Sequence, residues 1–225
     1  LVQDREPANP EALGEWWKSI DGWRAEREGK LYEPSNPGEA LKPQEVIEAV
    51  YRATRGEAFV TTDVGQHQMF AAQYYKFAKP NRFITSGGLG TMGFGFPAAM
   101  GVKLSYPQDD VVCFTGEGSF QMMMQELSTC KQFDVGVKIV NLNNQSLGMV
   151  RQWQDLNYKS RHAHSYMESL PDFAKLIEAY GFTAIKVTTH EELAPALERA
   201  FADTNELVFL DIYVDPFEHV YPMQV

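Results

Sequence analysis

From residue 43 onward, the apolar pattern switches between segments of helical period and short runs with the composition of strands. The runs Val-Val-Cys-Phe at 111–114 and Val-Lys-Ile-Val at 137–140 are almost continuously apolar, as in strands buried on both faces of a parallel sheet. The pattern predicts strands at 58–62, 82–85, 111–115, 137–142, 183–187 and 207–214. It predicts helices at 45–55, 67–76, 96–105, 119–133, 171–180 and 191–202, and a further helix that begins near Gly148.

Strands and helices that alternate along one chain are typical of an α/β fold with parallel strands. We therefore expect a three-layer fold, in which a mainly parallel sheet is flanked by helices on both sides. In sheets of this kind, ligands bind outside the carboxyl ends of the strands. The loops that directly follow strands are accordingly the first places to look for a site.

The first 40 residues differ from the rest of the chain. A helix is predicted at 11–28, and the stretch 32–43, which contains Pro and Gly, is typical of a linker. We expect residues 1–40 to form a connector and residues 41–225 to form the main domain. Because the chain opens without an initiator Met, it resembles a piece of a longer protein. Adjacent Trp16 and Trp17 either pack within the connector's own contacts or mark a face covered by a missing domain.

Composition narrows the class of protein. Hydrophobic residues make up 44% of the 225 residues and charged residues 22%, which excludes a disordered or low-complexity chain. No apolar run approaches the roughly 20 residues of a membrane helix. The net charge of −10 disfavours nucleic acid as a partner, because phosphate backbones are bound by basic faces. Cys113 and Cys130 form no C-x-x-C pair, which favours reduced thiols and a cytoplasmic protein.

Three loops that follow predicted strands, at 63–67, 116–119 and 143–148, carry polar residues or glycines. Gly116 and Gly118 permit a tight turn close to a ligand, and Ser119 opens a helix whose free N–H groups favour an anion. Glu117 stands beside this anion site, so a cation is needed between the two. Asn144 ends the next predicted strand, and Mg²⁺ prefers oxygen ligands completed by phosphate and water. The spacing predicts one phosphate–metal site.

A second hypothesis comes from the segment Gly88-Leu89-Gly90-Thr91-Met92-Gly93, which matches the G-x-G-x-x-G fingerprint. It follows the predicted strand at 82–85 and precedes a helix, and Glu117 would then be the ribose ligand of a Rossmann-type NAD-binding domain. This interpretation leaves the loops at 63–67 and 143–148 without a role.

Longer strings give the chain a family resemblance. Gly116-Glu117-Gly118-Ser119 followed by Asn143-Asn144 resembles the metal motif of thiamine diphosphate enzymes. Thr-Asp-Val-Gly-Gln-His-Gln-Met at 62–69, Leu-Gly-Met-Val at 147–150 and Gln-Trp-Gln at 152–154 sharpen it, as do the strings at 84–93 and 125–129. From about residue 40 to its end, the chain resembles the catalytic large subunit of acetohydroxyacid synthases, also called acetolactate synthases.

The resemblance implies a thiamine diphosphate-binding fold and a set of site residues. The side chains of Glu117 and Asn144 and the backbone carbonyl of Ser146 would hold Mg²⁺; the family has aspartate where this chain has Glu117, which keeps the charge and adds one methylene. Gly90 and Met92 would contact the aminopyrimidine, and Met149 and Trp153 would line the substrate pocket. The diphosphate would be bound by Gly65, Gln66, His67, Ser119, Gly148 and Met149. Gly116, Gly118 and Asn144 would complete the cofactor-binding residues.

The implied activity is that of a transferase in the biosynthesis of valine, leucine and isoleucine. Pyruvate would be decarboxylated and condensed with pyruvate or 2-ketobutyrate, with thiamine diphosphate and Mg²⁺ as cofactors. The family's activating glutamate lies on an upstream pyrimidine domain and its FAD on a middle domain, both absent here. No catalytic residue can therefore be named, and we expect the isolated chain to be inactive.

The resemblance also implies partners and a compartment. We expect a homo-oligomer formed through the full-length subunit, a small regulatory subunit, and a cytoplasmic protein of bacterial type, or a plastid or mitochondrial one in a eukaryote. Other thiamine diphosphate-dependent decarboxylases and carboligases share the metal motif, and a scaffold with a degenerate motif stays open because of Glu117. Met122, Met123 and Met124 are predicted to pack as a helix face on the sheet. Residues 158–166 resemble the family's mobile segment over the site.

Overall fold

The computed structural model describes residues 9–27 and 32–222 of the chain. They form two units, divided between Pro34 and Ser35. The first contains helix α1 (Pro10–Arg27), in which the rings of Trp16 and Trp23 pack edge to face with 5.6 Å between their centroids. Glu28, the predicted last residue of this helix, lies outside the described residues. Both interpretations of Trp16 and Trp17 stay predictions.

The second unit is built on a six-stranded sheet in which every pairing is parallel, in the order β2-β1-β3-β4-β6-β5. The prediction of a parallel α/β sheet is confirmed. The strand predicted at 58–62 from its composition forms at Phe59–Thr62, and all four of its positions are buried, which suits an interior strand of the sheet. The strands are β1 (Phe59–Thr62), β2 (Phe83–Thr85), β3 (Val111–Thr115), β4 (Lys138–Asn143), β5 (Thr183–Val187) and β6 (Val208–Tyr213).

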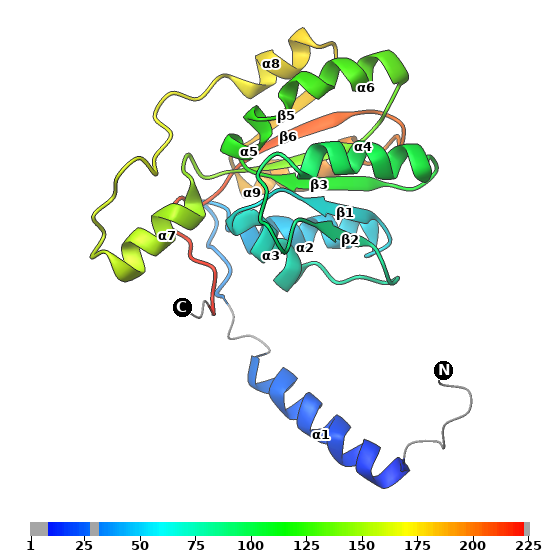
Figure 1. Ribbon diagram of the computed structural model, residues 1–225, viewed down its shortest axis with the longest axis vertical. Helices are drawn as coiled ribbons and strands as arrows, with labels where there is room; N and C mark the ends of the chain where they lie inside the picture. Colours follow the sequence, from blue (N-terminus) through cyan, green and yellow to red (C-terminus); the bar gives the residue numbers. More distant parts are fainter. Residues whose placement is uncertain (1–8, 28–31, 223–225) are drawn as a thin grey trace. The chain divides into compact units, whose positions relative to one another are not determined.

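Helices cover both faces of this sheet and complete the three layers (Figure 1). On one face lie α4 (Gly95–Ser105), α5 (Glu117–Gln121), α6 (Leu127–Phe133) and α8 (Phe173–Ala179). On the other lie α2 (Pro43–Thr54), α3 (Gln66–Tyr74) and α9 (His190–Ala200), whereas α7 (Gly148–Asn157) stands beyond the strand ends. None of the helices within the described ranges is long and apolar enough to span a bilayer.

Aromatic side chains fill the core between the sheet and the α4 side. The Phe120 ring lies 4.7 Å from that of Phe209 and 6.0 Å from that of Phe96, measured between centroids, and all three side chains are fully buried. Each buried aromatic side chain removes a large apolar area from water, which is the main favourable contribution to folding. Phe120 belongs to α5, so this packing also fixes the turn that precedes it.

The predicted helix at 119–133 is wrong as one element. It consists of α5, a turn, a 3-10 helix at Met124–Glu126 and α6. Three consecutive methionines would point about 100° apart in a continuous helix, so they cannot share one face. The break leaves Met122 50% exposed, brings Met123 against Gly93 and packs Met124 on the core. The expected methionine face on the sheet is therefore wrong for Met122 and Met123.

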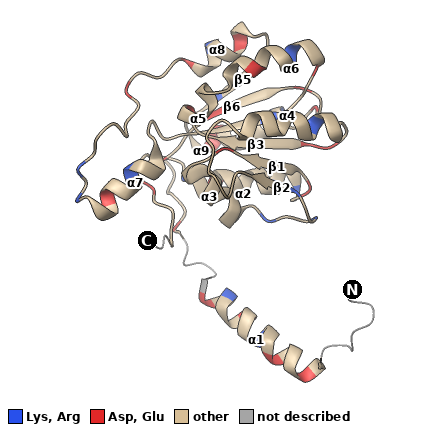
Figure 2. Cartoon of the chain, viewed as in Figure 1, with Lys and Arg blue, Asp and Glu red and all other residues tan. Residues whose placement is uncertain are grey.

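Two further features concern the surface and the boundary of the second unit. Basic and acidic residues are interspersed along the described chain (Figure 2).

The boundary between the two units falls before Ser35, earlier than position 40. The Ser35 hydroxyl lies 2.7 Å from His190 Nε2, and the Ser35 N–H donates to Glu45 at 3.2 Å. These contacts tie the end of the connector to α2 and α9.

Candidate functional site

The strand order creates a crevice at the carboxyl ends of β1 and β3. The chain leaves β1 toward β2 on one side and leaves β3 toward β4 on the other, so the two connections diverge between these neighbouring strands. Such a switch point is where ligands bind in open parallel sheets. The register pairs Thr115 with Asn141, which places the loop after β4 beside the loop after β3, as the spacing predicted. The three predicted loops thus meet at one edge.

A cavity of about 280 Å³ occupies this edge. Its wall includes every residue predicted to bind cofactor or metal; Trp153, predicted for the substrate pocket, does not line it. The Trp153 side chain, on α7, is 40% exposed. The predicted residues that line the cavity are Gly65, Gln66, His67, Gly90, Met92, Gly116, Glu117, Gly118, Ser119, Asn144, Ser146, Gly148 and Met149.

Glu117 places a carboxylate inside the cavity wall with only 2% of its surface exposed. Burial raises the pKa of Glu117 to about 8, the Asp211 carboxylate adds to this effect, and the Gln145 N–H that donates to Glu117 Oε1 opposes it. A buried carboxylate of this kind becomes favourable as an anion when a cation lies beside it. The position is therefore chemically suited to a cation ligand.

Asn144 and Ser146 supply oxygen atoms to the same wall. Asn144 Oδ1 accepts from the Ser146 N–H at 3.1 Å and from its hydroxyl at 3.2 Å, while Asn144 Nδ2 donates to Gln66 Oε1 at 3.2 Å. Within residues 9–27 and 32–222, no three His, Cys, Asp or Glu side chains gather as a metal site. A metal ion here would thus need amide, carbonyl and ligand oxygens besides Glu117, which is typical of Mg²⁺.

Two helices begin at the cavity with N–H groups that no side chain caps. Neither Gly65, before α3, nor Leu147, before α7, makes a side-chain capping bond. Uncapped N-termini leave N–H donors and a partial positive charge, which favour phosphate oxygens. Both helices start where the cavity wall is formed, so they suit a bridging diphosphate.

His67 stands between the first two loops. A Cβ atom on Gly65 would lie 2.8 Å from the ring, and one on Gly116 would lie 3.1 Å from it, so both glycines make room for the imidazole. Burial lowers the pKa of His67 to about 4, although the Asp63 carboxylate raises it, so the ring is neutral at pH 7. Its Nε2 atom is buried and has no hydrogen-bond partner among the residues that the structure describes. A ligand that offers a hydrogen-bonding group would satisfy this atom.

Asp63, which the sequence analysis did not single out, holds the glycine-rich loop in place. Its carboxylate accepts from the N–H groups of Val64, Gly93 and Gly95 at 3.0, 2.7 and 3.2 Å. Gly95 approaches so closely that a Cβ atom would lie 2.5 Å from Asp63 N. The loop follows β2, the edge strand, and brings Gly90 and Met92 to the cavity. An aspartate directly after a buried strand was the available signal.

Residues 165–167 lie beside the loop that carries Asn144 and Ser146, and the sequence analysis did not predict this contact. The Leu147 N–H donates to the Ser165 carbonyl at 2.7 Å and the Met167 N–H to the Gln145 carbonyl at 2.9 Å, forming a short antiparallel bridge. The expected mobile segment at 158–166 therefore ends on the loop that carries Asn144 and Ser146. No periodicity signals such a bridge, because a single pair of residues forms it.

The cavity fits thiamine diphosphate with a divalent cation. Three features of the cavity wall fit this ligand. The buried His67 Nε2 suits a hydrogen-bonding group, and the uncapped N-termini of α3 and α7 suit the phosphate oxygens. The buried Glu117 carboxylate suits a cation. At Gly118, a Cβ atom would come within 2.9 Å of Leu147 and 3.6 Å of Met92, so only glycine keeps this part of the cradle open. The geometry defines an α/β domain whose strand ends enclose a cavity suited to a diphosphate and a divalent cation.

Comparison with known proteins gives this domain a family. Residues 63–212 match the thiamine pyrophosphate enzyme family, C-terminal TPP-binding domain, and this match covers more than half of the chain. The chain therefore belongs to the thiamine pyrophosphate enzymes. The match supports the thiamine diphosphate interpretation over the dinucleotide one, and the glycine-rich loop forms part of the same cavity.

Several curated relatives share more than half of their residues with this chain over the matched length. The acetolactate synthase large subunit of Haemophilus influenzae is 57% identical over 213 residues, which are 95% of this chain and 37% of that protein. The isozyme 3 large subunit of Escherichia coli is 55% identical, with the same coverage. The chloroplastic acetolactate synthase 1 of Nicotiana tabacum is 46% identical over 91% of this chain and 32% of its own length. The chain thus spans about a third of these relatives.

Proposed function

We propose that this chain is the thiamine diphosphate- and Mg²⁺-binding catalytic domain of an acetolactate synthase. The observation that carries the proposal is the single cavity in which Glu117, Asn144 and the uncapped starts of α3 and α7 converge. The identity to acetolactate synthase large subunits supports it. The product would serve the synthesis of valine, leucine and isoleucine.

The chain's own residues bind and orient the cofactor in this proposal. Glu117, Asn144 and the carbonyl of Ser146 would hold Mg²⁺, and His67 and the N-termini of α3 and α7 would hold the diphosphate. Met92 would contact the ring system of the cofactor. When bound, thiamine diphosphate supplies the carbanion chemistry that decarboxylates one 2-keto acid and transfers the two-carbon unit to another. Leu142, Met149 and Val150 contribute apolar parts of the cavity wall.

Substrates and partners follow from the same relatives. Pyruvate and a second pyruvate or 2-ketobutyrate would enter beside Met149, with Trp153 closing the pocket in the complete enzyme. The relatives are named large subunits, which supports a small regulatory subunit as a partner. FAD and the remaining catalytic groups would come from further domains and from a second subunit of a homo-oligomer. A bacterial protein of this kind would be cytoplasmic.

Calorimetric titration of thiamine diphosphate into the purified chain, with and without Mg²⁺, tests the proposal. We expect binding that requires Mg²⁺ and that is lost in Glu117→Ala, because this change removes the carboxylate ligand. NAD serves as the competing ligand, and a Glu126→Ala variant serves as the control, because Glu126 lies outside the cavity wall. NAD binding without thiamine diphosphate binding would favour the dinucleotide interpretation. Absence of binding by both would leave only a scaffold role.

A further inference from the structure

The segment after β6 is hydrogen-bonded to one buried side chain of α7. Gln152 Nε2 donates to the Val220 carbonyl at 2.9 Å, and the Val220 N–H donates to Gln152 Oε1 at 2.9 Å. Gln152 is fully buried, as is Val220. Only one orientation of the Gln152 amide satisfies both backbone groups. The backbone of Val220 therefore fixes which way the oxygen of Gln152 points.

The orientation of the Gln152 amide in turn orients the Gln66 amide. Its Nε2 donates to Gln152 Oε1 at 2.7 Å and to the Glu218 carbonyl at 3.1 Å. Both partners are acceptors, so Gln66 must present its NH₂ group to them and its Oε1 atom to the opposite side. Gln66 is 4% exposed, so water offers little substitute for these bonds.

Asn144 is the last amide of the series. Gln66 Oε1 accepts from Asn144 Nδ2 at 3.2 Å, which turns Asn144 Oδ1 toward Ser146 and the cation position. Gly148 makes room for this pair, because a Cβ atom there would lie 2.1 Å from Gln66 Oε1 and 2.6 Å from Asn144 Nδ2. A reversed Asn144 amide would place two oxygens against each other and a donor against the ion.

We infer that the backbone of Val220, Gln152, Gln66 and Asn144 form an amide relay that makes Gln152 a positioning residue for the Mg²⁺ ligand Asn144. The inference rests on the proposed function, because it assumes a cation beside Asn144. Hydrogen bonds behind a metal ligand orient it and typically change metal affinity by 10- to 100-fold. Gln152 touches neither metal nor cofactor in this arrangement and acts through Gln66.

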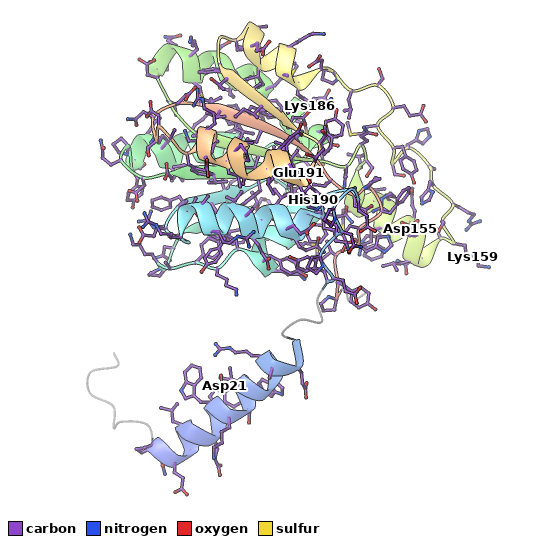
Figure 3. All side chains as sticks on the ribbon, turned by 180° about the vertical axis from the view of Figure 1, so that it is seen from behind. Asp21, Asp155, Lys159, Lys186, His190 and Glu191 are labelled. Carbon is purple, nitrogen blue, oxygen red and sulfur yellow. The ribbon has the colours of Figure 1, made fainter. Side chains whose placement is uncertain are left out.

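The segment that carries Val220 is attached to α7 at two further places. Arg151 Nη2 donates to the Glu218 carbonyl at 3.2 Å, and Asp155, labelled in Figure 3, lies 2.9 Å from His219 Nε2. These contacts hold the segment even when the Gln152 bonds are removed. Substitution of Gln152 is therefore expected to disturb the relay without detaching the segment.

Titration of Mg²⁺ into the full chain, with thiamine diphosphate present, tests the relay in Gln152→Met. Methionine keeps the length and fills the space but neither donates nor accepts strongly. Gln66 Nε2 then keeps only its bond to the Glu218 carbonyl at 3.1 Å, so the orientation of Gln66 and Asn144 is less firmly fixed. We expect Mg²⁺ affinity to fall at least tenfold. Gln73→Met is the matched control, because Gln73 is exposed and donates to the Tyr221 carbonyl of the same segment at 3.3 Å, outside the relay. Its Mg²⁺ affinity should equal that of the parent.

Gln152→Glu separates orientation from stability. A glutamate keeps an oxygen to accept from Gln66 and from the Val220 N–H, but it places a second oxygen against the Val220 carbonyl. The relay predicts that this variant retains Mg²⁺ affinity within about threefold of the parent, although unpaired buried charge makes it no more stable than Gln152→Met. A purely structural role predicts instead that Mg²⁺ affinity follows the free energy of unfolding in both variants.

The outcomes distinguish the relay from the proposed function. If the parent chain binds no Mg²⁺ with thiamine diphosphate, the proposed function fails. If the parent binds and a folded Gln152→Met binds equally well, the relay alone is overturned. Should the variants not fold, the side-chain amide protons of Gln66 and Gln152 in the parent protein decide by NMR: slow exchange with water supports the relay and rapid exchange contradicts it.

Discussion

Because Gly148 has no side chain, the amides of Gln66 and Asn144 can form a hydrogen bond across it. Gln66 and Asn144 pass over Gly148, where a Cβ atom would lie only 2.1 Å from Gln66 Oε1, so any other residue would collide with this side chain. Asp63 and His67 show the same dependence on glycine, at Gly95 and Gly65. The site is thus built as much from close backbone approaches as from the groups that carry charge.

Gly148→Ala should therefore damage both packing and metal binding. The methyl group must displace Gln66 or Asn144, and overpacking of a buried position typically costs about 1–3 kcal/mol of the free energy of unfolding. We expect a loss of that size in urea denaturation and weaker Mg²⁺ binding in calorimetry. Gly101→Ala is the control, because Gly101 lies in α4 with no atom within 4 Å of its Cβ position. It should stabilise the chain by about 0.5–1 kcal/mol; equal effects at both positions would refute the close approach.

Among the elements, regular strands were predictable and interruptions were not. The strands at 111–115 and 183–187 coincide with β3 and β5. The first is an almost continuous apolar run that is buried at every position, whereas the second is a partly exposed edge strand whose β-branched residues favour extended structure. The break between α5 and α6 left no mark in the sequence, since Gly93 and the core, both distant in sequence, determine where Met123 and Met124 turn.

The site residues also fall into two groups, those that the sequence predicts and those that only the structure reveals. Glu117, Asn144 and His67 directly follow predicted strands, so the parallel topology alone brings them together. Gln152 and Val220 lie outside those loops, and only their tertiary pairing reveals a role. Trp153 came from the family resemblance, and its placement in a pocket stays a prediction.

The corner between α9 and β6 should give the unit a defined acid sensitivity. Hydrogen bonds from Arg199, at 2.6 and 2.7 Å, and from Thr183 lower the pKa of Glu206 to about 2. A carboxylate with a depressed pKa stabilises the fold above its unfolded pKa, and this contribution is lost as the pH falls toward 2. Because the Arg199 side chain is half exposed, solvent screening reduces the effect to about 1 kcal/mol.

Glu206→Gln should accordingly be less stable than the parent by that amount at pH 7, and the difference should vanish near pH 2. Urea denaturation at several pH values measures it. Glu57→Gln is the control, because Glu57 forms only an exposed ion pair with Lys79 at 3.8 Å and should stay within about 0.5 kcal/mol of the parent. A difference that persists unchanged at low pH would assign the effect to packing.

At the scale of the whole molecule, the cavity at the strand ends offers few groups for acid–base chemistry. Of the described residues that line the cavity, only Glu117 and His67 have ionisable side chains, and the proposed function assigns both to the cation and the diphosphate. No further acid or base is left for the reacting end of the cofactor. This agrees with the chain spanning about a third of its relatives.

We therefore expect the isolated chain, saturated with thiamine diphosphate and Mg²⁺, to form no acetolactate from pyruvate. A colorimetric acetoin assay measures the product after acid treatment. A longer polypeptide that includes the upstream domains, made with the same sequence at 35–225, should restore activity, and its Glu117→Ala variant should lose it again. Turnover by the isolated chain would show that a proton-transferring group within this sequence has been overlooked.

Val220 follows every other residue of the relay in chain order, so the ribosome delivers it last among them. A nascent chain that has emerged only as far as β6 already carries Glu117 and Asn144, yet nothing sets the amides of Gln152 and Gln66. We therefore expect the proposed cation site to reach its full affinity only after the segment beyond β6 has been synthesised.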